Sequence, residues 1–149
     1  MSIEAPTGTD TRERDKAPRE LLELVQGAAA IPRGALGLKR AEEEESYGTA
    51  SRFVEYELDS VYLRARSFIG SDWDFDQEGA VRENYGVLAE ILGIGRMSCE
   101  IRGGRVEEIS FVDAKDSSKV WRNEHTPECM EEAISLLELA LDSIKSSEL

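Results

Sequence analysis

The chain has 149 residues, 40% of them hydrophobic, which is enough for one domain with a modest core. With 31 acidic and 18 basic residues its formal charge is -13, so its surface repels phosphate backbones at long range. Binding of a nucleic acid would therefore require a local basic face. The two cysteines are too few for a disulfide framework, and no apolar run approaches the roughly 20 residues of a membrane helix. The first ten residues show no secretory signal, and we therefore expect a cytoplasmic, intracellular protein with reduced thiols.

The first 46 residues are predicted to be a flexible N-terminal segment with one short helix. Residues 1–16 have no hydrophobic period and are predicted to be disordered. Apolar residues at helical spacing then predict an amphipathic helix over residues 18–30. Residues 31–46 contain a proline, glycines and four consecutive glutamates, which favours a linker with a solvated charge run. We therefore predict a compact domain over residues 47–149.

Residues 51–68 favour a β-hairpin over a single long strand. A turn at Asp59 and Ser60 brings the apolar residues of both arms to one side. The pairs predicted on that side are Leu58 with Val61, Tyr56 with Leu63, and Val54 with Ala65. On the other side the predicted pairs are Glu55 with Arg64 and Phe53 with Arg66. The basic arm therefore has a counter-charge within the hairpin.

The stretch over residues 72–83 has two interpretations. Its acidic residues fill positions 1, 3, 5 and 12 of a calcium-binding loop, but the glycine needed at position 6 is replaced by Gln77. Alternatively, it is a short extended segment whose Asp76 caps a helix over residues 77–93. The apolar residues at helical spacing are Val81, Tyr85, Leu88, Ile91 and Leu92. We therefore predict the capped helix and no metal site.

Two runs of alternating apolar residues flank Gly103 and Gly104 and predict a second hairpin. We predict a three-residue loop over residues 103–105. The pairs expected on the apolar side are Met97 with Phe111, Cys99 with Ile109, and Ile101 with Glu107. On the other side Glu100 faces Glu108, which is unfavourable unless water or a cation screens the two charges. This pair is the best acidic site candidate in the chain.

The C-terminal part begins with a polar crossover in which Val120 and Trp121 are predicted to form a short edge strand. Thr126 then caps a helix that begins at Pro127. The apolar stripe of this helix is broader than one small sheet needs, which suggests a dimer contact on its other side. His125 lies four residues before Cys129, but a polar helix start beside a buried thiol is favoured over a metal site.

The elements together predict an α+β fold, namely a small antiparallel sheet from two β-hairpins in a ββαββα core, with helices packed on one face. The sequence contains no motif for nucleophilic, nucleotide-dependent or zinc-dependent catalysis. Its single histidine, His125, stands at a helix start beside glutamates rather than near a nucleophile. We therefore predict a non-enzymatic binding protein without a cofactor.

The order of elements and several short motifs resemble the tombusvirus-type suppressors of RNA silencing. The motifs are LGLK at 36–39, ESYG at 45–48, FVEY at 53–56, IGSDW at 69–73, LGIG at 92–95, IRGGRV at 101–106 and ECMEEAISLLELAL at 128–141. In that family a homodimer with a continuous sheet cradles a small RNA duplex, which is recognised through phosphates and 2′-hydroxyls. The resemblance therefore implies a homodimeric viral-type suppressor that sequesters small duplex RNA.

The resemblance also implies which residues face the RNA. Arg102 and Arg105 match basic positions of the family, and Arg64 and Arg66 join them from the first hairpin. The family's N-terminal tryptophans, which stack on the duplex ends, have no counterpart, because the tryptophans here lie at 73 and 121. The alternative is an acidic regulatory module that binds a basic protein, as an immunity protein, a chaperone or a nucleic-acid mimic does. Its predicted face comprises Glu55, Glu57, Glu100 and Glu108.

Overall fold

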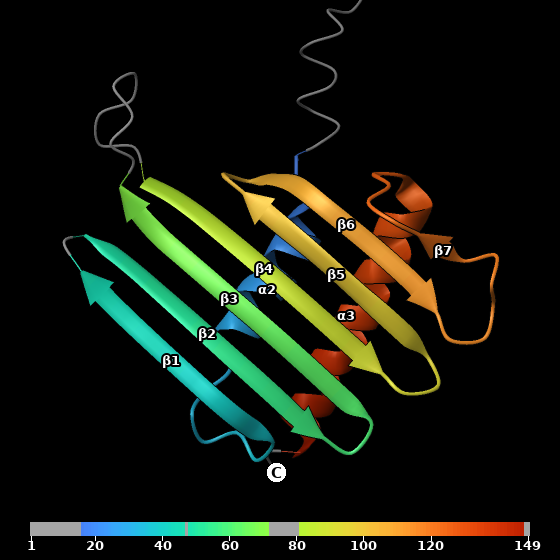
Figure 1. The fold of residues 1–149 in the computed structure, drawn as a ribbon, viewed down its shortest axis with the longest axis horizontal. Coiled ribbons are helices and arrows are strands. Elements are labelled where there is room, and N and C mark those ends of the chain that lie inside the picture. Colours follow the sequence, from blue (N-terminus) through green and yellow to red (C-terminus); the bar gives the residue numbers. More distant parts are fainter. Residues whose placement is uncertain (1–15, 47, 72–80, 148–149) are drawn as a thin grey trace, which may run out of the picture.

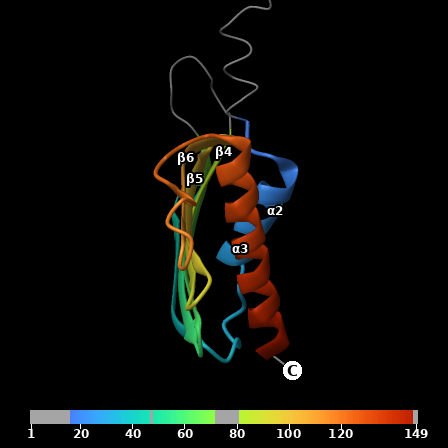
Figure 2. The same ribbon diagram turned by 90° about the vertical axis from the view of Figure 1, so that its right-hand side faces the viewer.

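The computed structural model describes residues 16–46, 48–71 and 81–147, and most of these residues form one antiparallel sheet with two helices. Seven strands lie side by side in chain order (Figure 1). They are β1 (Leu38–Ser46), β2 (Thr49–Leu58), β3 (Val61–Ser71), β4 (Val81–Ile91), β5 (Gly95–Arg102), β6 (Arg105–Asp113) and β7 (Val120–Trp121). The helices α2 (Arg19–Ala29) and α3 (Pro127–Ser147) cover the same face of the sheet (Figure 2).

The core lies between the sheet and the two helices. Buried and exposed side chains alternate along the strands, as on β5, where Met97, Cys99 and Ile101 are buried and their neighbours are not. Leu21 of α2 and Leu137 of α3 are fully buried against this apolar face. All of the buried side chains among the described residues are apolar, so burial of hydrophobic surface is the main force that holds this fold together.

The α3 helix begins as predicted. The Thr126 hydroxyl accepts a hydrogen bond of 3.2 Å from the backbone N–H of Cys129, which is the predicted cap. The broad apolar stripe of α3 does not require a second copy of the chain, because α3 packs on α2 as well as on the sheet. Leu136 and Ala140 are buried there, whereas Leu139 is 44% exposed.

The first hairpin was predicted correctly, and the second was predicted correctly except at its tip. All five predicted pairs between β2 and β3 are present. Between β5 and β6 the pairs of Met97, Cys99 and Glu100 are also as predicted. The three-residue loop is wrong, because Ile101 pairs with Val106 and Arg102 pairs with Arg105. Gly103 and Gly104 adopt the positive φ angles, 57° and 81°, that a two-residue hairpin turn requires, and a register shift takes up the extra residue.

The helix predicted over residues 77–93 is wrong for the part that the structure describes. Residues 81–91 form β4, which pairs with β3 on one side and with β5 on the other. The apolar residues of this stretch also fit a period of two, since Tyr85, Val87, Ala89 and Ile91 are all buried. Residues 72–80, with the predicted cap and most of the calcium-loop positions, lie outside the described residues, as do residues 1–15, which were predicted to be disordered.

The linker predicted over residues 31–46 is also wrong from residue 38 onward, because residues 38–46 form the edge strand β1. The glutamates of this strand are exposed, and Glu43 forms an ion pair of 3.0 Å with Arg33. The strand β1 therefore belongs to the same sheet as the later strands, and α2 packs on one face of that sheet. The sequence analysis had put both elements before the compact domain. The predicted α+β class with an antiparallel sheet is confirmed, whereas the ββαββα core is not.

Candidate nucleic-acid interface

One face of the sheet is not covered by any described element, and we call it the open face; it is turned toward the viewer in Figure 1. Cross-strand pairing arranges its side chains in four transverse rows. The first row is Glu44, Ser51, Phe68, Asn84, Arg102 and Arg105, and the second is Glu42, Phe53, Arg66, Gly86, Glu100 and Glu108. The third row is Arg40, Glu55, Arg64, Leu88, Ser98 and Ser110, and the fourth is Glu57, Tyr62, Glu90, Arg96 and Val112.

The open face contains all eight site residues that were predicted from the sequence. The arginines predicted to face RNA and the glutamates predicted to face a basic partner therefore occupy the same surface rather than two competing ones. The four rows hold six arginines and seven glutamates, so the surface is nearly neutral and -12 of the formal charge of -13 lies elsewhere in the chain. A nearly neutral surface repels an approaching anion less than the net charge of the whole chain would suggest.

Gly86 makes room for a charge interaction across the middle of the sheet. The Arg66 guanidinium on β3 crosses over Gly86 on β4 and forms an ion pair of 2.5 Å with Glu100 on β5. A Cβ atom at Gly86 would lie 2.9 Å from Arg66 Nε. A larger residue at this position would therefore displace the arginine.

Glu100 is shared by two arginines. Besides Arg66 it has Arg102 at 3.9 Å, and these cations offset the repulsion from Glu108, which is directly opposite on β6. Arg102 is itself directly opposite another cation, Arg105. Arg105 and Arg64 form no ion pair with any residue that the structure describes. The open face therefore holds arginines that are outside ion pairs with the described residues, together with glutamates, Glu57 and Glu108, of which the same is true.

Two further contacts engage residues of the third and fourth rows. The Tyr62 hydroxyl donates a hydrogen bond of 2.6 Å to Glu55, and this bond is the main cause that raises the pKa of Tyr62 above its ordinary value. The Arg40 guanidinium lies over the Phe53 ring, 4.8 Å from the ring centroid. Of the four glutamates predicted for a basic partner, Glu55 and Glu100 thus already have partners on the open face.

The open face is hollowed by two adjacent cavities. The larger, of about 690 Å³, extends over the first two rows from β1 to β5. The smaller, of about 450 Å³, extends over the second and third rows and shares Phe53, Arg66 and Glu100 with the larger. Two features of the larger cavity are unusual, namely the Phe68 side chain, which is 44% exposed, and Asn84 Oδ1, which is buried without a hydrogen-bond partner.

The sequence analysis missed Phe53, Phe68, Asn84 and Gly86 as site residues. Phe68 follows Arg64 and Arg66 at a spacing of two, so the alternation along the predicted strand was enough to place it on the same face. The sequence analysis did not place Asn84 and Gly86 on this face, because it predicted their segment to be a helix. Their position between Arg66 and Arg102 depends on the pairing of β4 on both sides.

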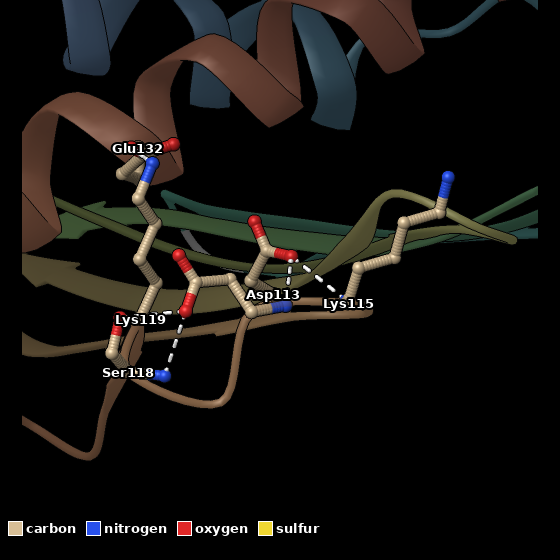
Figure 3. A network of polar contacts seen from close by, with 6 residues as sticks. Asp113, Lys115, Ser118, Lys119 and Glu132 are labelled. Atoms are coloured by element: carbon tan, nitrogen blue, oxygen red, sulfur yellow. Dashed lines mark hydrogen bonds and ion pairs between the residues drawn. The ribbon is translucent and has the colours of Figure 1, made fainter.

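A second polar cluster lies at the connection between β6 and β7 (Figure 3). Asp113 Oδ1 accepts hydrogen bonds of 2.9 Å from the backbone N–H groups of Lys115 and Asp116, which lower the pKa of Asp113. Lys119 reaches Glu132 of α3 at 3.1 Å. These contacts fix the connection and tie it to α3, and we assign the cluster a structural role.

The sequence offered two alternatives for metal binding, namely the calcium loop over residues 72–83, most of which lies outside the described residues, and the pair of His125 and Cys129. His125 Nε2 lies 3.1 Å from Asn123 Oδ1, and Cys129 is buried, which raises the pKa of its thiol to about 11. The described residues contain no group of three or more histidine, cysteine or acidic side chains arranged to hold a metal ion. Among the described helices, none combines the length and the apolar character needed to cross a membrane.

Comparisons of the chain with family models, with curated proteins and with solved structures found no match. The resemblance to the tombusvirus-type suppressors therefore remains a prediction based on the quoted motifs, and function has to be argued from the open face.

Proposed function

We propose that the open face binds small duplex RNA and that the protein sequesters this RNA as a homodimer, in the manner of a viral-type suppressor of RNA silencing. The observation that carries the proposal is the concentration of arginines on one nearly neutral face of a strongly acidic molecule. Two of these arginines, Arg64 and Arg105, have no ion-pair partner among the described residues.

The chemistry of the cations also favours a phosphate ligand. All basic side chains in the four rows are arginines, whose planar guanidinium groups bind phosphate through two parallel hydrogen bonds. Arg102 and Arg105 are directly opposite each other and repel, and a phosphate between them would relieve that repulsion. Such contacts are independent of base sequence, as shape-based recognition of duplex RNA requires.

The alternative is a basic protein partner, and the ion pairs of Glu100 engage the predicted RNA-facing residues Arg66 and Arg102 as much as the predicted acidic face. It depends on Glu55, Glu57, Glu100 and Glu108, but Glu55 is engaged by Tyr62 and Glu100 by two arginines. A basic partner would have to compete with these contacts. We therefore treat this alternative as an outcome of the experiment below.

A dimer is part of the proposal because one sheet is small. Seven strands at a spacing of about 4.8 Å span about 29 Å between the outermost strands, which is shorter than a duplex of small-interfering length. Two copies would double the number of arginines available to the phosphates. Light scattering with and without RNA measures the mass directly, and a monomer in both states would contradict this part of the proposal.

The test is a fluorescence anisotropy titration with a labelled duplex of small-interfering length at about 50 and about 200 mM salt. If four arginines contact phosphates, the affinity should fall about 100-fold between these two concentrations. Arg64→Ala and Arg102→Ala should each weaken binding by about tenfold at the lower salt and reduce the salt dependence by about one phosphate contact.

Arg19→Ala is the matched control. Arg19 lies on α2, on the covered side of the sheet, and its side chain is 91% exposed; among the described residues it forms an ion pair only with Glu23. This variant should bind like the unmodified protein. The proposal fails if no RNA binds at the lower salt, or if Arg19→Ala weakens binding as much as Arg64→Ala. Absence of RNA binding would favour the basic-protein alternative.

A further inference from the structure

The middle of the first row has features that contacts with duplex phosphates do not explain. Phe68, Asn84 and Arg102 are consecutive cross-strand neighbours on β3, β4 and β5. All three line the cavity of about 690 Å³. They combine an exposed aromatic ring, an amide and a cation within one hollow of the open face.

Asn84 needs a hydrogen-bond donor. Its Oδ1 atom is buried and has no hydrogen-bond partner among the residues that the structure describes, which is unfavourable for a polar atom. Phosphate oxygens are acceptors and cannot satisfy another acceptor. The partner that fits is therefore an N–H or O–H group that enters the cavity with a ligand.

Phe68 offers a stacking surface beside this acceptor. Its side chain is 44% exposed, although burial of such a large apolar group is normally favourable. Aromatic side chains on exposed sheets stack on unpaired nucleobases, whereas bases within a duplex are stacked on one another and inaccessible. An unpaired base would cover the ring and bring a donor to Asn84 at the same time.

Arg102 can adjust to admit such a ligand. Its side chain is 64% exposed, and its only ion pair among the described residues is the long contact of 3.9 Å with Glu100. Arg102 is the cross-strand neighbour of Asn84, so its charge is available beside Asn84 for the phosphate of the incoming nucleotide.

We propose that the cavity receives an unpaired nucleobase with an exocyclic amino group, which stacks on Phe68, donates to Asn84 Oδ1 and leaves its phosphate beside Arg102. The inference rests on the proposed function and specifies its substrate class, namely duplexes with unpaired ends rather than blunt duplexes. Adenine carries such an amino group, whereas the base of purine riboside has a hydrogen atom in its place and no N–H donor, so adenosine ends should bind more tightly than purine-riboside ends.

The experiment uses three labelled RNAs with the same paired core, which end blunt, in unpaired adenosines or in unpaired purine ribosides. Stacking of one base is expected to make the adenosine-ended RNA bind about tenfold more tightly than the blunt one. The hydrogen bond to Asn84 is expected to account for about a fivefold preference for adenosine over purine riboside. Thermal unfolding of each variant confirms that it is folded.

Two variants separate the contributions. Asn84→Leu should lose the preference for adenosine over purine riboside, and Phe68→Leu should lose most of the gain from either unpaired end. Arg19→Ala, on the covered side, should keep all three affinities. Equal affinity of the unmodified protein for the blunt and the adenosine-ended RNA would overturn the inference and leave the proposed function intact. Failure to bind any of the three RNAs would overturn both.

Discussion

Arg52 joins the C-terminal end of α2 to the sheet. Its guanidinium donates hydrogen bonds of 2.5 Å to the carbonyl of Ala29 and 2.7 Å to the carbonyl of Ile31, and its Nε lies 3.7 Å from Glu43. The Arg52 side chain is 18% exposed, and Ala29 and Ile31 are both buried. Carbonyls at the end of a helix lack partners within the helix, so the cation satisfies groups that have few other options.

Replacing Arg52 with alanine should therefore destabilise the protein substantially. Each hydrogen bond from a charged donor contributes about 1.5–3 kcal/mol, and water can replace part of it at this half-buried position. We expect the free energy of unfolding to fall by about 2–4 kcal/mol, which corresponds to a decrease in Tm of about 5–15 °C for a chain of this size. Urea unfolding followed by circular dichroism measures the difference.

Two further variants make the test specific. Arg52→Lys keeps the charge but has a single ammonium group instead of a two-pronged donor, and it should lose roughly half as much stability. Arg19→Ala removes a cation from an exposed ion pair on α2 and should cost no more than about 0.5 kcal/mol. If Arg52→Ala costs as little as Arg19→Ala, the helix carbonyls do not depend on Arg52 and the reasoning is wrong.

Three other predictions concern stability. Gly37→Ala should destabilise by about 1–3 kcal/mol in urea unfolding, because its Cβ would lie 2.7 Å from the buried Tyr56 ring, whereas Gly34→Ala, with no atom within 4 Å, should not. Asn84→Leu should raise the free energy of unfolding by about 1 kcal/mol, since it removes a buried acceptor that has no partner among the described residues. A decrease in the free energy of unfolding would contradict the inference that this acceptor is unsatisfied. Burial raises the pKa of Cys99 from 9.0 to about 12. Between these two pH values the thiol is therefore neutral in the folded chain and ionised in the unfolded chain. Its contribution is complete below pH 9 and is lost as pH rises toward 12. The loss should be smaller in Cys99→Ala, in which the buried Cys129 thiol, whose pKa is also raised, still contributes.

Local patterns in the sequence were sufficient for the first hairpin, for the second hairpin except at its tip, for the start of α3 and for the short strand β7. In the first hairpin, alternation and a two-residue turn determined every pair, because any slip by one residue would expose Val54 and Tyr56. The same register predicted that Arg64 and Arg66 share a face, and the structure brings Arg102 and Arg105 to that face as well. This part of the candidate site was therefore accessible from the sequence.

Only the tertiary structure decided the nature of β1 and β4. Residues 81–91 contain apolar side chains at both helical and strand spacing, and pairing with strands on both sides selects the strand. Residues 38–46, with four glutamates, have weak strand preference and become a strand because β2 offers an edge on which they can pair. The positions of Asn84 and Gly86 beside the arginines follow from this long-range pairing, which no local sequence pattern contains.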